Sequence, residues 1–302
     1  MSRPPLNRRQ LGRELSAAGR ADAAAILALA PAAVAQAATR IGFTGPPGAG
    51  KSTLVSRLAD RYSRDDRRVG ILAIDPSSPV SGGSILGDRI RMDELSLAPD
   101  VYIRSVPSRS ANDGLTPNVA EMLNIMDRHH FDDVLVETVG IGQTDHAVHA
   151  LVDTVVLVLV PESGDTIQAM KAGILELAHI YVVNKSDRPN AAQLRASLEG
   201  VLALGRDNAT QWRPPVVLTV AADNDLADLE DAIAAHREWL RDHEDPISRR
   251  RRRARQLAES VIATAVAETA GELPPALYDG ALDELYAAYV ERLRGKAGSA
   301  QR

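Results

Sequence analysis

The stretch GPPGAGKST occupies residues 45–53, between the apolar run IGF at residues 41–43 and the run LVSRL at residues 54–58. It fits the pattern G-x-x-x-x-G-K-S/T in the strand–loop–helix setting that a phosphate-binding loop requires. The glycines let backbone N–H groups converge on phosphate oxygens, Lys51 supplies a charge to the β- and γ-phosphates, and the Ser52 hydroxyl is placed to bind Mg²⁺. The predicted phosphate-binding residues are Gly45, Gly48, Ala49, Gly50, Lys51, Ser52 and Thr53.

Strand and helix patterns alternate from residue 40 onward. Unbroken apolar runs, such as TVVLVLV at residues 154–160, are typical of parallel strands that are covered on both faces. With the phosphate loop, this alternation predicts an α/β fold of the P-loop NTPase type, with a mostly parallel, doubly wound sheet. Ligands of such sheets bind beyond the carboxyl ends of the strands. The expected strands are 41–43, 69–74, 101–104, 134–137, 154–160, 180–183 and 216–220, and the expected helices are 52–63, 119–129, 168–177, 191–204 and 226–240.

Helical patterns flank this region on both sides. Residues 1–39 are an expected N-terminal helical segment, and residues 40–244 are the expected P-loop domain. Residues 245–302 are an expected C-terminal helical hairpin, with helices at 248–269 and 277–293.

The first helix of the hairpin carries an apolar stripe that includes Leu257, Val261, Ile262 and Val266. Such a stripe either folds back on its own domain or meets a partner chain. We favour the second alternative, which predicts a homodimer.

Composition limits the classes of partner. The chain has 302 residues, a net charge of −5 and a pI near 5.8, so the overall charge gives no reason to expect nucleic acid binding. Cysteine is absent, which removes disulfides and thiolate metal sites and suits a reducing cytosol. One stretch is strongly basic, with five arginines at residues 249–253. We interpret it as the solvated start of a helix, the alternative being a surface for an anionic partner.

An Ala-rich stretch at residues 23–38 resembles a signal peptide. Pro31 interrupts it, Asp22 adjoins it and the first strand begins shortly after it, so we reject a cleaved signal. The stretch is also too short and too weakly apolar to span a bilayer. We therefore expect a cytoplasmic protein without a membrane segment. The arginine-rich N-terminus leaves a mitochondrial transit peptide as an alternative.

The tetrapeptide NKSD at residues 184–187 follows an expected strand. N-K-x-D at a strand end, downstream of a phosphate loop, is the guanine-reading element of G proteins. The Asp187 carboxylate can accept from N1–H and from the exocyclic amine of guanine, whereas adenine offers no such pair. A site built around a specific hydrogen bond can discriminate by about 10⁴. Asn184, Lys185 and Asp187 are therefore predicted to bind GTP or GDP, the alternative being an ordinary polar loop.

Two carboxylates end expected strands. Asp75 follows the strand at 69–74 and opens DPSSPVSGGS, and Glu137 ends the strand at 134–137 and opens ETVGIGQ. Both are predicted to point toward the phosphate loop and to bind Mg²⁺, directly or through water, together with Ser52. The alternative for each is a capping or solvated carboxylate.

The residues after these strands are candidate switches. Residues 77–92 are rich in Ser and Gly and include Asp88, and they are expected to order around Mg²⁺ and GTP. Gly140 suits a backbone N–H near the γ-phosphate, while Gln143 either orients water or faces solvent. We interpret the histidines as surface residues rather than metal ligands; they are His129, His130, His146 and His149.

Four motifs carry a resemblance to a known family: GPPGAGKST, LAIDPSSPVSGGSILGDRIRM, VETVGIGQTDHAV and NKSD. Together they resemble the MeaB/ArgK-type G proteins, whose human relative is the methylmalonic aciduria type A protein. The resemblance covers residues 40–240, and the flanking helices resemble that family's N-terminal segment and dimerisation arm. It implies a SIMIBI-class GTPase that chaperones an adenosylcobalamin-dependent acyl-CoA mutase, gates its cofactor loading and protects it from inactivation. The family's active-site positions match Lys51, Asp75, Asp88 and Glu137, with Ser52 at the Mg²⁺ position.

The chain departs from the family pattern in three loops. The guanine-side loop reads Val220-Ala221-Ala222 instead of S-A-L, and we expect the backbone N–H of Ala221 to remain available to the base. Residues 108–115 replace S-R-G-x-x-G-G, and PESGD at residues 161–165 replaces P-G-x-G-D. The last loop is expected to face the mutase, so its divergence suggests a mutase other than the methylmalonyl-CoA enzyme.

Taken together, the residues and the resemblance predict a homodimeric, Mg²⁺-dependent GTPase with slow intrinsic turnover that its mutase partner stimulates. A cobalamin adenosyltransferase is a further candidate partner. Two alternatives stay open: a P-loop kinase that phosphorylates a small molecule or a protein, and a nucleotide-dependent scaffold that does not hydrolyse GTP.

Overall fold

The computed structural model of the protein describes residues 3–28, 37–76, 95, 97–108, 118–138, 150–162, 178–204 and 212–299. Several predicted features lie outside these residues. They are the helix at 168–177, the segment 77–92 with Asp88, the loop residues 109–115 and 163–165, and Gly140, Gln143, His146 and His149. Asp75 belongs to a described strand, but its side chain also lies outside the description.

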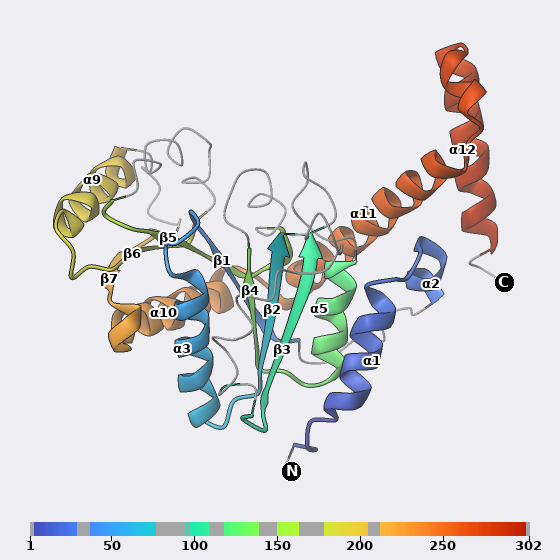
Figure 1. Cartoon of the computed structure of the whole chain (residues 1–302). Helices are drawn as coiled ribbons and strands as arrows, with labels where there is room; N and C mark the ends of the chain where they lie inside the picture. Colours follow the sequence, from blue (N-terminus) through green and yellow to red (C-terminus); the bar gives the residue numbers. More distant parts are fainter. Residues whose placement is uncertain are drawn as a thin grey trace.

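Seven parallel strands form a sheet in the order β3-β2-β4-β1-β5-β6-β7 (Figure 1). The predicted α/β fold with a parallel sheet is therefore confirmed. The chain builds one half of the sheet on one side of β1 and the other half on the opposite side. Loops beyond the carboxyl ends of β1 and its neighbours thus meet where the strand order reverses, which is where such sheets bind ligands. The strands are β1 (Thr39–Thr44), β2 (Val69–Pro76), β3 (Val101–Ser108), β4 (Asp133–Glu137), β5 (Thr154–Leu159), β6 (Ile180–Asn184) and β7 (Val216–Thr219).

Helices cover both faces of the sheet. Successive side chains of a strand point to opposite faces, so each strand feeds two hydrophobic layers. In β5, Val156 and Val158 enter the layer beneath α3 and α10, while Leu157 and Leu159 enter a layer on the other face. This double burial explains the unbroken apolar run. The helices are α3 (Lys51–Arg64) and α10 (Ala227–His243) over the first layer, and α1 (Arg8–Ala18), α5 (Val119–Arg128) and α9 (Ala191–Leu204) over the other face.

The N-terminal helix α1 contributes to the second layer. Leu11, Leu15 and Ala18 of α1 are fully buried, and α1 packs against α5. The N-terminal segment is therefore part of the packing that covers the sheet.

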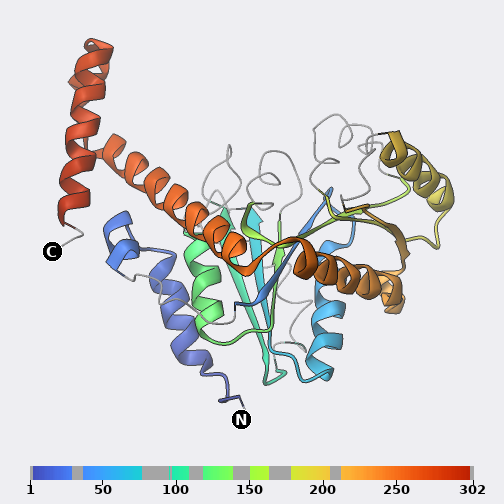
Figure 2. The ribbon, with the colours of Figure 1, turned by 180° about the vertical axis from the view of Figure 1, so that it is seen from behind.

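The C-terminal hairpin projects away from the sheet (Figure 2). Its first helix, α11 (Pro246–Glu272), begins earlier than expected, because Asp245 caps it and Pro246 suits the first turn. A short 3₁₀ helix, η4 (Pro275–Asp279), leads to α12 (Leu282–Ser299). Among the described helices, none combines the length and apolar character needed to cross a bilayer.

The predicted apolar stripe of α11 is divided between two environments. Val261 is buried against α2 (Ala23–Ala28), together with part of Leu257. Ile262 and Val266 stay 61% and 40% exposed. The stripe therefore folds partly onto the chain's own N-terminal segment and leaves an apolar remainder on the surface.

The arginine run at 249–253 enters a buried network of ion pairs. Arg253 donates to Asp153 over 2.7 Å, and Arg252 pairs with the same carboxylate over 3.2 Å. Burial opposes ionisation of Asp153, but Arg253 and the backbone N–H of Arg40 outweigh it and hold the pKa of Asp153 below its ordinary value. The interpretation of a solvated helix start is therefore wrong for Arg253, whose side chain is 10% exposed, because the fold places a distant carboxylate against it. Arg252 pairs with the same carboxylate but stays 37% exposed.

Arg40 completes this network at the start of β1. Its side chain is buried and donates to Asp127 over 2.7 Å and to Asn124 over 3.0 Å. Burial, followed by the charge of Arg253, lowers the pKa of Arg40 to about 10, so it remains charged at neutral pH. The network joins α11 to β1, α5 and the start of β5 at the amino-terminal edge of the sheet, opposite the phosphate loop.

Candidate functional site

The phosphate-binding loop connects β1 to α3 and packs against the ends of β5 and β6. Gly45 has a φ of 137°, and a Cβ atom there would lie 2.0 Å from the carbonyl oxygen of Val158. Gly50 has a φ of 94°, and a Cβ atom there would lie 2.3 Å from Nδ2 of Asn184. Glycine alone tolerates both the left-handed backbone and these approaches. The loop is thus held between β5 and the NKSD turn.

Lys51 opens α3, and its ammonium group lies inside the loop. Nζ donates to the carbonyl oxygens of Gly45 over 2.8 Å and of Pro46 over 3.1 Å, and the residue is buried. Both of these carbonyl acceptors are neutral groups that carry no net charge. A phosphate oxygen in the loop would add a negative charge on the acceptor side, which strengthens the attraction to the ammonium group. The ammonium group can therefore exchange backbone acceptors for phosphate.

Ser52 and Glu137 meet beside the loop. Oγ of Ser52 donates to Oε1 of Glu137 over 2.6 Å. The pairing of β1 with β4 aligns Phe43 with Glu137, which brings the end of β4 next to the loop that follows β1. Two hard oxygen donors thus lie together at the position expected of a Mg²⁺ site.

Asp75 lies at the same edge of the sheet. The register of β2 against β4 aligns Ala73 with Glu137, so Asp75 lies farther along β2 toward the loops. Asp88, the fourth predicted active-site residue, lies outside the described residues.

Asn184 joins the phosphate loop to the guanine-side loop. Its Nδ2 donates to the carbonyl oxygen of Ala49 over 2.8 Å. Its Oδ1 accepts from the backbone N–H of Ala221 over 3.1 Å and from Oγ1 of Thr219 over 3.2 Å. All three contacts are buried. The sequence did not predict Thr219 as a site residue. Its position as a polar residue at the end of the apolar strand VVLT is the feature that could have indicated this role.

Lys185 and Asp187 lie on the open side of the same turn. Nζ of Lys185 donates to the carbonyl oxygen of Gly48 over 2.8 Å, so a second lysine spans the phosphate loop. The Asp187 side chain is exposed. The structure thus brings the NKSD turn and the phosphate loop together and leaves the Asp187 carboxylate on the surface.

The guanine-side loop differs from expectation. Ala221 opens the 3₁₀ helix η3 (Ala221–Asp223) after β7, and Val220 forms a bridge with Asp225. The backbone N–H of Ala221 was expected to be available to the base, but it donates to Asn184 and is buried. That expectation is wrong, because the loop folds back on Asn184. Ala222 is exposed.

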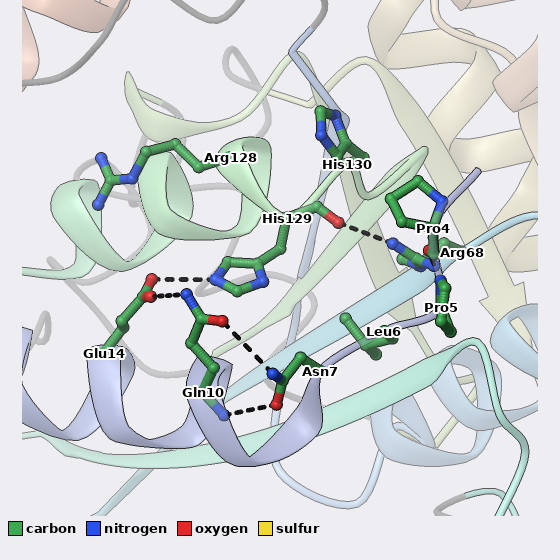
Figure 3. A pocket seen from close by; sticks show the side chains of 10 residues that line it. All are labelled: Pro4, Pro5, Leu6, Asn7, Gln10, Glu14, Arg68, Arg128, His129 and His130. Atoms are coloured by element: carbon green, nitrogen blue, oxygen red, sulfur yellow. Dashed lines mark hydrogen bonds and ion pairs between the residues drawn. The ribbon is translucent and has the colours of Figure 1, made fainter.

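A cavity of about 350 Å³ lies near the amino-terminal ends of β2 and β4, and Figure 3 shows the residues that line it. Nε2 of His129 lies 2.9 Å from Oε2 of Glu14, which joins α5 to α1, while His130 is exposed. The prediction of a surface residue therefore holds for His130, whereas His129 is largely covered. The cavity is remote from the phosphate loop and is lined by Pro4, Pro5, Leu6, Asn7, Gln10, Glu14, Arg68, Arg128, His129 and His130.

Residues 13–272 match the family described as methylmalonyl Co-A mutase-associated GTPase MeaB. This chain belongs to the MeaB family of GTPases. The resemblance predicted from the motifs is confirmed, and so is the prediction of a GTPase at the level of the family.

Relatives of this MeaB-family chain carry related names. A protein of Pyrococcus abyssi named as a GTPase is 40% identical over 248 residues, covering 81% of this chain and 76% of that protein. The mitochondrial methylmalonic aciduria type A homolog of Mus musculus is 41% identical over 181 residues, covering 59% and 44% respectively. GTPase ArgK of Escherichia coli is 38% identical over 187 residues, covering 61% and 56%.

A solved structure supports the fold of this MeaB-family chain. The crystal structure titled LAO/AO transport system kinase matches with a TM-score of 0.65 at 22% identity, over 99% of this chain and 100% of that chain. At this identity the match supports the fold and not an activity.

Proposed function

We propose that this protein hydrolyses GTP to GDP and phosphate in the presence of Mg²⁺, and that it chaperones an adenosylcobalamin-dependent acyl-CoA mutase. One observation supports the first part above all: three elements meet at one edge of the sheet. Ser52 bonds Glu137 over 2.6 Å, and Asn184 bonds Ala49 over 2.8 Å. These bonds join the phosphate loop to an acidic strand end and to the guanine-reading turn.

The oxygen donors beside the loop suit Mg²⁺. Mg²⁺ prefers hard oxygen ligands such as hydroxyl and carboxylate groups. Oγ of Ser52 and Oε1 of Glu137 are 2.6 Å apart, so the two oxygens would be available to one ion. Ser52 would bind the ion directly, and Glu137 and Asp75 would bind it directly or through water. When bound, Mg²⁺ supplies neutralisation of charge on the β- and γ-phosphates.

The remaining residues would position the nucleotide. Lys51 would contact the β- and γ-phosphates, and Asp88 would act on the attacking water or in the switch. Asp187 accepts from the base, supported by Asn184 and Lys185. The loop Val220-Ala221-Ala222 closes the guanine side. Phosphoryl transfer of this kind depends on positioning and charge stabilisation rather than on covalent catalysis.

The partner part of the proposal rests on names and on exposed surface. The family description names a methylmalonyl-CoA mutase association, and the mouse relative is named for methylmalonic aciduria. We extend both to this chain as an acyl-CoA mutase partner, with a cobalamin adenosyltransferase as a further partner. The divergent loop at 161–165 favours a mutase other than the methylmalonyl enzyme. Exposed Ile262 and Val266 favour a homodimer formed by the hairpin.

We further propose that the protein acts in the cytoplasm and has three parts. These are an N-terminal helical segment at 1–39, a P-loop domain at 40–244 and a C-terminal dimerisation arm at 245–302.

Phosphate release from GTP and from ATP, with and without Mg²⁺, tests the enzymatic part. We expect Mg²⁺-dependent release from GTP, and a loss of about a hundredfold or more in Lys51→Ala because one charged phosphate contact disappears. Arg195→Ala, which removes an exposed cation on α9, is the control. Equal release from ATP, or an unchanged rate in Lys51→Ala, would contradict the assignment.

The same assay separates the two alternative functions. A kinase would consume nucleotide only with an acceptor and would yield a phosphorylated product. A scaffold would bind GTP and release no phosphate even with its partner.

Pull-down against several purified acyl-CoA mutases, with GDP or a non-hydrolysable GTP analogue, tests the chaperone role. Capture of one mutase in a nucleotide-dependent manner is expected. Capture of none would contradict this role, and a preference for the methylmalonyl enzyme would contradict the inference from residues 161–165.

A further inference from the structure

An ion pair joins the loops that follow β5 and β6. Nη1 of Arg188 donates to both carboxylate oxygens of Glu162, over 2.7 Å and 2.6 Å. Glu162 lies just beyond the end of β5, and Arg188 directly follows Asp187 of the NKSD turn. The side chains of Arg188 and Glu162 are 44% and 52% exposed.

The backbone of the NKSD turn is held without this ion pair. Lys185 adopts a left-handed φ of 57°, and its carbonyl oxygen accepts from the N–H of Arg188 over 3.0 Å. The N–H of Ser186 donates to the carbonyl oxygen of Thr219 over 3.1 Å. Because these bonds fix the turn, the Arg188 side chain is not needed for its shape. The position of that side chain depends on the carboxylates around it.

A second carboxylate, that of Asp187, adjoins Arg188 in the chain. The hydrogen bond of Arg188 to Glu162 and the charge of Glu162 raise the pKa of Arg188 above the ordinary value, and the charge of Asp187 contributes less. Within the part of the chain that the structure describes, Asp187 is the other carboxylate whose charge acts on Arg188, and it remains when Glu162 is replaced. A guanidinium bonded to Asp187 would occupy the oxygens that guanine N1–H and the exocyclic amine require. Exposed pairs of this kind shift an equilibrium by about two- to fivefold.

We propose that Glu162 is a specificity-determining residue that keeps Arg188 away from Asp187 and so leaves the Asp187 carboxylate open to guanine. This inference rests on the proposed function, in which Asp187 reads the base. Glu162 acts through Arg188 and is therefore a positioning residue rather than a catalytic one.

A double-mutant cycle on the full chain tests the proposal. Calorimetric titration with GDP and with ADP compares the wild type, Glu162→Gln, Arg188→Gln and the double variant. Glu162→Gln is expected to weaken GDP binding by about two- to fivefold, because Arg188 then pairs with Asp187. Arg188→Gln is expected to bind GDP like the wild type, and the double variant is expected to regain wild-type affinity. The kcat of Glu162→Gln at saturating GTP should equal that of the wild type. In 0.5 M salt, the difference in GDP affinity between the two proteins should become smaller.

Two results would overturn the proposal. One is a Glu162→Gln variant that binds GDP like the wild type. The other is an Arg188→Gln variant whose affinity for GDP falls as much as that of Glu162→Gln, with no recovery in the double variant. The ion pair would then act by holding the two loops together and not by keeping Arg188 away from Asp187. The wild type and Asp187→Asn are titrated alongside. If the wild type bound GDP and ADP equally well, the proposed function itself would be refuted. If the wild type preferred GDP and Glu162→Gln had the same affinity for GDP, only this inference would be refuted. Unchanged melting temperatures show that all variants fold.

Discussion

Nδ2 of Asn184 lies 2.8 Å from the carbonyl oxygen of Ala49, although 135 positions separate the two residues. The parallel order β1-β5-β6 brings the end of β6 near the loop that follows β1. The same Asn184 side chain accepts the N–H of Ala221 from the loop after β7. One buried amide therefore sets the distance between the phosphate loop and the guanine-side loop.

Replacing this amide should affect folding as well as binding. Asn184→Ala leaves the N–H of Ala221 and the carbonyl oxygen of Ala49 without their partner, and a buried unsatisfied group costs about 1–3 kcal/mol. We expect a melting temperature lower by several degrees and weaker binding of GDP, measured by calorimetry and titration. Asp187→Asn is the matched control, because its side chain is exposed and should change nucleotide selectivity without changing the melting temperature. Equal melting temperatures for the two variants would contradict the bridging role.

Two glycines of the phosphate loop should respond differently to alanine. Both Gly48 and Gly50 have left-handed φ values, 74° and 94°. A Cβ atom on Gly50 would lie 2.3 Å from Asn184, whereas one on Gly48 would meet nothing within 4 Å. Gly48→Ala should cost about 1 kcal/mol of backbone strain, and Gly50→Ala should cost more and abolish tight GDP binding. Similar losses in the two variants would mean that strain alone, and not contact with Asn184, requires glycine at position 50.

The arginine run offers a stability test within one helix. Arg253→Ala leaves the buried Asp153 and Asp127 short of a cation, and loss of one partner from a buried pair costs about 3 kcal/mol or more. Arg250→Ala, in the same run but exposed, should change the free energy of unfolding by less than about 0.5 kcal/mol. Urea denaturation of both variants measures the difference. If the two variants were equally stable, the network would not hold α11 to the sheet.

A buried histidine should make stability depend on pH. His236 lies in α10, with Nδ1 2.9 Å from Oγ1 of Thr154 and its ring 4.7 Å from that of Trp212. Burial lowers the pKa of His236 to about 4, and Asp153 opposes the shift. The folded state therefore favours neutral His236, while the unfolded chain binds the proton near pH 6.5. The resulting stabilisation is complete above pH 6.5 and is lost as the pH falls toward 4, by about 3 kcal/mol.

Melting temperature and tryptophan fluorescence between pH 7.5 and 4.5 measure this loss. His236→Phe should be less stable at pH 7.5, because Thr154 loses its partner, but should show a flatter pH dependence. His130→Gln, an exposed change, should follow the wild type. Protonation of Asp153 does not contribute to the change between pH 7.5 and 4.5. The pKa of Asp153 is lowered, so the stability that its ionised form provides is lost only as the pH falls below the ordinary value of 3.8. A wild-type melting temperature that stays constant from pH 7.5 to 4.5 would contradict the assignment.

Local sequence was sufficient for the strands, the phosphate loop and the NKSD turn. The apolar run at 154–160 requires burial on two faces, and β5 is buried on both. The glycines of GPPGAGKST predict a loop that only a permissive backbone can form, and Gly45, Gly48 and Gly50 all have positive φ values. These features depend on periodicity and on backbone conformations that neighbouring residues decide, so they can be read along the chain. The family could also be predicted from the sequence, because each of its motifs is an uninterrupted stretch of residues.

Contacts between distant segments were decided only by the tertiary structure. From the sequence, Arg253 was expected to be solvated, but in the fold it pairs with Asp153. Likewise, the N–H of Ala221 was expected to be available to a ligand, but it donates to Asn184. The ion pair between Glu162 and Arg188 has no sequence signal either. In each case the energy of a charge or a polar group depends on its dielectric surroundings and on its partner. Those are set by strand order and loop position, which the amino-acid pattern around each residue does not contain.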